Sequence, residues 1–76
     1  MRKNDIVEVT WMDIVQDPTW QKEDDATVAK PVLCKSVGYF LDRTDKFLRI
    51  SESMNNLGER SVQVFPIGTV LKVRKL

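Results

Sequence analysis

The 76-residue sequence has no histidine and a single cysteine. The absence of histidine removes the commonest general base at neutral pH and a common metal ligand. A zinc site would have to be built from carboxylates and the one thiolate, Cys34, which is an unusual set of ligands. We therefore expect a protein that is not an enzyme, with no catalytic residue, no small-molecule substrate, no metal and no cofactor.

Long apolar runs are also missing, and each run falls far short of the ~20 residues needed to span a bilayer. The N-terminus MRKNDIVEV has no apolar segment of the kind found in signal peptides. A lone cysteine cannot form a disulfide within the chain, which suits a reducing compartment. Because Cys34 lies in the apolar stretch PVLCKSVGYFL, we expect it to be a small buried hydrophobe. These features predict a cytoplasmic protein without a membrane partner.

The length and composition fit one small soluble domain that covers residues 1–76. Hydrophobic residues make up 42% of the sequence and charged residues 30%, as in globular rather than disordered chains. A domain of this size buries a modest core. Assembly with copies of itself would therefore be a natural source of stability.

Charge is divided unevenly along the chain, although the net charge is only +1. Residues 1–25 carry three cations against seven anions, a net charge of −4, and residues 26–76 carry nine against four, a net charge of +5. A surface divided in this way can steer an anionic partner to one side, or it can join copies of the chain. A mixed, solvated surface is the third interpretation.

Alternating apolar and polar residues predict five short strands, and in the first of them Val7, Val9 and Trp11 alternate with Glu8 and Thr10. The predicted strands span residues 5–13, 32–41, 46–53, 62–65 and 69–76. Gly38 in the second strand predicts a bend or a close backbone approach. In the later strands, we expect Leu48 and Ile50 to face the core together with Val62 and Val64, while Phe47 and Arg49 face away.

The segment 14–31 is the least strand-like part of the sequence. Asp17 followed by Pro18 is typical of a helix start, so we expect one or two helical turns that end before Pro31. Trp20 is expected to pack this insert against the strands. The predicted fold is all-β: a small five-stranded, strongly bent antiparallel barrel of SH3-like type, with a short helical insert between strands 1 and 2.

The second half of the chain, residues 36–76, resembles the Sm and LSm family, which includes the bacterial Hfq type. Positions comparable to the first Sm motif are filled by Gly38, Phe40, Asp45 and Phe47. Leu48 stands where the family has asparagine. In the second motif, Ile67 and Gly68 keep the glycine but lack the preceding arginine.

The layout of the whole chain is also similar to small Sm-like proteins of marine cyanophage type. The stretches that carry this likeness are VTWMD, DPTW, SVGYFL and IGTVLKV. An Sm chain normally starts with a helix and joins its first two strands by a short turn. This chain instead starts almost directly with a strand and has the insert at that join.

The resemblance implies a homo-oligomeric ring of five to seven members. Sm-like proteins pair the fourth strand of one copy with the fifth strand of the next. In this sequence, VQVF and TVLKV would otherwise be exposed edges that invite the addition of another strand. A head-to-tail contact that closes on itself gives a ring.

The resemblance also implies binding of single-stranded RNA, or of DNA, by two loops around a pore. These loops correspond to residues 42–47 and 66–69. Phe47 is the candidate stacking platform, because every base has a π-face. The cations expected to contact phosphates are Arg43, Lys46 and Arg49, with a second basic strip at Lys72, Arg74 and Lys75.

Other interpretations of the same residues remain open. Phe47 can fill a barrel mouth or a subunit interface, and the cations of the tip can pair with Asp42, Asp45 or Glu52 on a solvated hairpin. The alternative function is an SH3-like protein-interaction module, or a phage-encoded adaptor of a host protein, with aromatic side chains as anchors. The aromatic residues considered for that role, which can equally form the core, are Trp11, Trp20, Tyr39 and Phe40.

Overall fold

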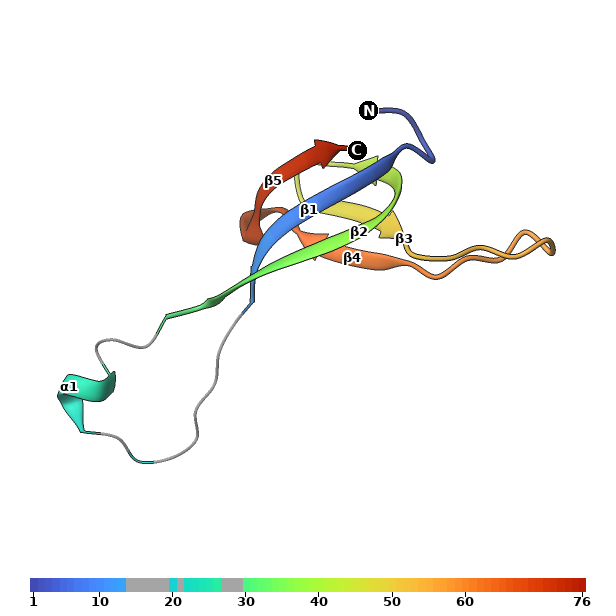
Figure 1. The fold of residues 1–76 in the computed structure, drawn as a ribbon. Helices are drawn as coiled ribbons and strands as arrows, with labels where there is room; N and C mark the ends of the chain where they lie inside the picture. The colour runs from blue at the N-terminus through green and yellow to red at the C-terminus, as the bar shows by residue number, and fades with distance from the viewer. Residues whose placement is uncertain (14–19, 21, 27–29) are drawn as a thin grey trace.

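The computed structural model describes residues 1–13, 20, 22–26 and 30–76 (Figure 1). Over these residues the fold is all-β, with almost no helix. The elements are β1 (Ile6–Asp13), α1 (Glu23–Ala26), β2 (Val32–Arg43), β3 (Phe47–Ser51), β4 (Gln63–Pro66), the 3-10 turn η1 (Ile67–Thr69) and β5 (Val70–Lys75). The prediction of five strands is confirmed, with boundaries that shift by a few residues.

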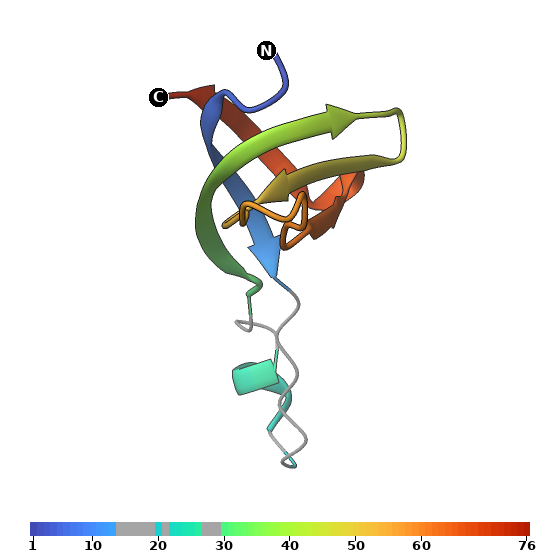
Figure 2. The same ribbon diagram turned by 90° about the vertical axis from the view of Figure 1, so that its right-hand side faces the viewer.

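The strands form one open antiparallel sheet in the order β4-β3-β2-β1-β5. Its edges are β4 and β5, which come last along the chain and lie at opposite ends of the strand order. The register shifts between Thr10 and Trp11 and again between Phe40 and Asp42. Such irregularities increase local twist, and β2 curves strongly as it crosses from β1 to β3 (Figure 2). Closure of this sheet into an Sm-like barrel stays a prediction.

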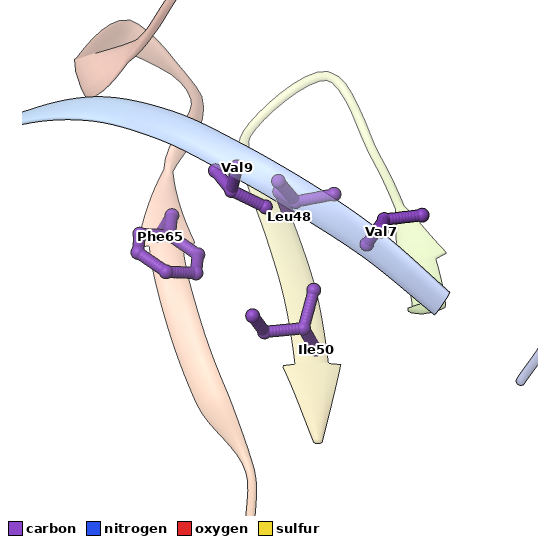
Figure 3. Packing of buried hydrophobic residues seen from close by; sticks show 5 residues of the cluster. All are labelled: Val7, Val9, Leu48, Ile50 and Phe65. Carbon is purple, nitrogen blue, oxygen red and sulfur yellow. The ribbon is translucent and has the colours of Figure 1, made fainter. Parts of the chain in front are cut away.

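The core lies on the concave side of the sheet, where β1 and β3 contribute alternate residues and β4 contributes one. Its buried hydrophobic side chains are Val7, Val9, Leu48, Ile50 and Phe65 (Figure 3). This confirms the alternation predicted for β1 and β3. Partly buried side chains pack around this cluster: Trp11, Phe40, Ile67, Val70 and Val73.

Trp11 connects the core to the polar part of the sheet. Its ring lies 5.3 Å from that of Phe65, centroid to centroid, in a tilted arrangement. Its Nε1 donates a hydrogen bond of 2.9 Å to Oγ of Ser36 on β2. An aromatic pair of this kind stabilises by about 0.5–1.5 kcal/mol beyond its buried area, so Trp11 is an important part of a small core.

Gly38 stands where β2 passes closest to β3, as the sequence predicts. A Cβ atom at this position would lie 2.8 Å from the carbonyl oxygen of Ser51 and 3.2 Å from Cδ1 of Ile50. The oxygen belongs to the backbone of a fully buried residue and has little freedom to move. Only glycine therefore allows the two strands to approach this closely.

The prediction for β4 is wrong. Val62 and Val64 are 54% and 49% exposed rather than buried. Phe65 lies opposite Leu48 and faces the core, so the alternation of the strand turns Val64 to the outer face beside Arg49. The bulkier aromatic side chain occupies the core, and its neighbour points outward.

The prediction that Trp20 packs the insert against the strands is also wrong, because this side chain is fully exposed. One helical turn, α1, lies in the insert, while the expected helix start at Asp17 and Pro18 falls outside the described residues. The short helical insert of one or two turns therefore stays a prediction. Cys34 is half-buried rather than buried, because the first residues of β2 run beyond the core toward the insert (Figure 1).

Replacing Gly38 with alanine should lower the free energy of unfolding by about 1–3 kcal/mol, the usual cost of overpacking. Urea or thermal unfolding measures this change. The matched control is Gly68→Ala, where the added Cβ meets nothing within 4 Å, and it should change stability by less than about 0.5 kcal/mol. Equal stabilities for the two variants would contradict the close approach at Gly38.

Candidate nucleic-acid interface at the β2–β3 and β4–β5 loops

The tip between β2 and β3 is fixed by one threonine side chain. Oγ1 of Thr44 accepts hydrogen bonds from the amides of Lys46 and Phe47, at 3.1 and 2.9 Å. The amide of Thr44 donates to the carbonyl of Phe47 at 2.8 Å. The turn is thus closed by both side-chain and backbone bonds, a usual role for threonine in turns.

The loop between β4 and β5 lies against this tip. The amide of Ile67 donates a hydrogen bond of 2.8 Å to the carbonyl of Lys46, and Pro66 lies opposite Phe47 in the sheet. Within the second loop, Oγ1 of Thr69 donates to the carbonyl of Pro66 at 2.8 Å. We call residues 43–47 and 66–69 together the loop cluster.

Phe47 is the aromatic side chain of the loop cluster. It is the first residue of β3, its side chain lies on the outer face of the sheet, and it is 39% exposed. The guanidinium carbon of Arg49 lies 5.9 Å from the centre of its ring. Cation–π contacts at exposed sites are worth about 0.5–1 kcal/mol, so Arg49 adds modestly to the order of this ring.

Arg49 is also held by a carboxylate on the neighbouring strand. Its Nη1 lies 2.9 Å from Oδ2 and 3.1 Å from Oδ1 of Asp42. This is one of the cross-strand pairs considered as an alternative in the sequence. The charge of Arg49 is therefore largely balanced before any ligand arrives.

Arg43 and Lys46 are the remaining cations of the tip. Both are exposed, and neither forms an ion pair with a residue in the described part of the chain. Asp45, beside them, likewise pairs with no described cation. The loop cluster thus offers two cations and an exposed aromatic ring within the β2–β3 turn.

Lys72 and Arg74 are not brought to the loop cluster. They lie on β5, opposite Thr10 and Glu8 of β1, at the far edge of the sheet from β4. Arg74 lies 3.4 Å from Oε1 of Glu8, and Lys35 approaches the same oxygen at 3.7 Å. These ion pairs balance much of the basic strip, and Lys72 is its cation without an ion pair to a described residue.

An ion pair also joins the N-terminal segment to the end of β5, between Asp5 and Lys75. The amide of Arg2 donates a hydrogen bond of 2.8 Å to Oδ2 of Asp5, which lowers the pKa of Asp5. Nearby Lys75, whose Nζ lies 3.6 Å from the same carboxylate, lowers this pKa further. This part of the surface therefore presents paired rather than free charge.

One hollow on the described surface borders the loop cluster, and another lies apart from it. The first is a groove of about 260 Å³ between the end of β1 and β4, lined by Trp11 and Phe65 and by Pro66 and Thr69 of the loop cluster. A second hollow of about 370 Å³ lies against the β3–β4 hairpin beside Arg60. In the described part of the chain, no three His, Cys, Asp or Glu side chains gather to hold a metal ion.

Sequence reasoning missed two features of this region. The first is the orientation of Val64, which faces outward although it was predicted to face the core. The pattern VQVF has apolar residues in both phases of the strand, so it does not show which phase is buried. The bond between the Ile67 amide and the Lys46 carbonyl leaves no sequence signal, since any non-proline residue can donate it.

Comparison with known proteins leaves this geometry as the main guide to function. No family model matches the chain, and neither a curated protein nor a solved structure matches it. Within residues 1–13, 20, 22–26 and 30–76, no helix has the length and apolar character needed to cross a membrane.

Proposed function

We propose that the protein is a cytoplasmic Sm-like ring protein that binds single-stranded nucleic acid, RNA in the first place, through the loop cluster. The observation that carries this proposal is the hydrogen bond between the Ile67 amide and the Lys46 carbonyl. It joins the two loops that the Sm resemblance implicates. It does so beside an exposed aromatic ring and two cations that form no ion pair with a described residue.

The chemistry of the loop cluster suits a single strand better than a duplex. Phe47 offers a face on which an unpaired base can stack, and such stacking contributes ~1–3 kcal/mol per base. Arg43 and Lys46 can contact the phosphates on either side of that base. Leu48, which stands in place of the family's asparagine, is fully buried and cannot read a base edge. Binding is therefore expected to tolerate many sequences.

Ring assembly would use the two free edges of the sheet. β4 and β5 each have one strand neighbour, so each leaves backbone donors and acceptors unpaired along its other side. The apolar groove beside β4 adds side-chain area next to one of these edges. Pairing β4 of one copy with β5 of the next would close the barrel edges and repeat the loop cluster around a pore.

The assembly is tested by mass. Native mass spectrometry and light scattering should give five to seven times the 8.8 kDa mass of one chain, with little change on dilution. The physical reason is that every copy would satisfy both of its edges only in a closed ring. A mass of one chain at all concentrations would contradict the ring.

Binding is tested by fluorescence anisotropy with labelled oligouridylate and oligothymidylate at two or more salt concentrations. Phe47→Ala should weaken binding by ~1–3 kcal/mol per stacked base. Lys46→Ala should make the dependence of log K on log salt shallower by about 0.7, the value for one phosphate contact on a single strand. This substitution should keep the two loops together, because Ile67 bonds to the backbone carbonyl of Lys46 and not to its side chain.

The matched controls are residues outside the loop cluster. Leu57→Ala removes an exposed apolar side chain from the β3–β4 hairpin, and Lys30→Ala removes an exposed cation. Both should leave affinity within about twofold, as expected for surface substitutions away from a site. Equal losses in the controls and in Phe47→Ala would place the binding surface elsewhere.

A protein-interaction module of SH3-like type is the second candidate function, and the fully exposed Trp20 favours it. Tryptophan is a frequent anchor at protein interfaces. In this case the oligonucleotides should not bind, and Trp20→Ala should abolish capture of a protein partner while Phe47→Ala retains it. The two candidates thus make opposite predictions for the same pair of variants.

A further inference from the structure

We propose that Asp42 is an acidic clamp that regulates the loop cluster by competing with nucleic acid for Arg49. This inference rests on the proposed function, because it concerns how the same site is opened. It assigns a role to a carboxylate that the proposed binding chemistry does not otherwise use.

The clamp is built by the irregularity in the pairing of β2 with β3. Phe40 lies opposite Ile50 and Asp42 lies opposite Arg49, so Leu41 is the extra residue on β2. If the register did not shift here, Arg49 would face Leu41 and would have no carboxylate directly across the sheet. The bulge therefore re-aims a side chain, which is a common use of such bulges near functional sites.

The position of Arg49 affects both parts of the binding chemistry. Nη1 lies within hydrogen-bond distance of both oxygens of Asp42, while the guanidinium carbon lies 5.9 Å from the centre of the Phe47 ring. In this arrangement the cation is balanced by a carboxylate, and it also covers part of the ring on which a base would stack. One ion pair thus withholds a phosphate contact and a stacking surface together.

The clamp is weak enough to be released. Both side chains are substantially exposed, 37% for Arg49 and 53% for Asp42, and exposed ion pairs contribute little to stability. A phosphate group offers Arg49 the same kind of charge-assisted bond that Asp42 does. Nucleic acid can therefore displace the carboxylate, and the competition sets the affinity that a ligand must exceed.

Asp42→Asn tests the clamp, with Glu52→Gln as the control. Each substitution neutralises one exposed carboxylate, but Glu52 lies outside the loop cluster and pairs with no cation in the described part of the chain. The probe is labelled oligouridylate, titrated by anisotropy into the full chain across a series of salt concentrations. Thermal unfolding of each variant checks that the fold is kept.

Asp42→Asn should tighten binding by about fivefold, the scale of a strong exposed ion pair. The salt dependence should become steeper by about 0.7, because Arg49 gains a phosphate contact. Glu52→Gln should tighten binding by less than about twofold. Adding Arg49→Ala to Asp42→Asn should remove the gain.

Three results would overturn the clamp. Equal gains for Asp42→Asn and Glu52→Gln would mean that only net charge matters. Weaker binding by Asp42→Asn would mean that the carboxylate positions Arg49 for the ligand rather than withholding it. If neither the unmodified chain nor any variant binds oligouridylate, the proposed function fails and the clamp fails with it, whereas binding by the unmodified chain isolates the test to Asp42.

Discussion

The close approach of β2 to β3 at Gly38 is the constraint on which the rest of the structure depends. With no Cβ between them, the backbone of β2 passes beside the Ser51 carbonyl, and β2 can curl from β1 over to β3. That curvature brings Val7 and Val9 of β1 over Leu48 and Ile50 of β3. Farther along the same strand the register shifts at Leu41, and this shift places a carboxylate opposite Arg49. Core and site therefore both depend on the course of β2.

The sequence predicts the fold best where the physics is local. In β1 and β3 one phase of the strand is clearly apolar, so Val7, Val9, Leu48 and Ile50 could be assigned to the core. In β4 both phases contain apolar residues, and the choice was made by pairing with β3, which sets Phe65 opposite Leu48. Such a choice depends on a neighbour that is distant in sequence, and a pattern within four residues does not contain it.

The candidate site follows the same division. The tip of the β2–β3 hairpin is local, so its cations and Phe47 could be located from the sequence. Lys72 and Arg74 were grouped with them because they share a charge, yet the strand order sets β5 at the opposite edge from β4. The link between the two loops came from the Sm resemblance alone, because they meet through backbone pairing, such as the bond between Lys46 and Ile67, which leaves no sequence signal.

Assembly and binding depend on one another in the proposed function. In the described part of the chain only five hydrophobic side chains are buried to the level of a core, and both edges of the sheet are unpaired, so one copy has little stability to spare. Within the same described residues, one loop cluster offers a single aromatic ring and two cations without ion pairs, while Asp42 balances the neighbouring Arg49. Such a site would hold a strand weakly at physiological salt. Repetition around a ring would let one strand contact several clusters at once, at an effective concentration far above that in solution. The edges that stabilise the assembly would then also be responsible for its affinity.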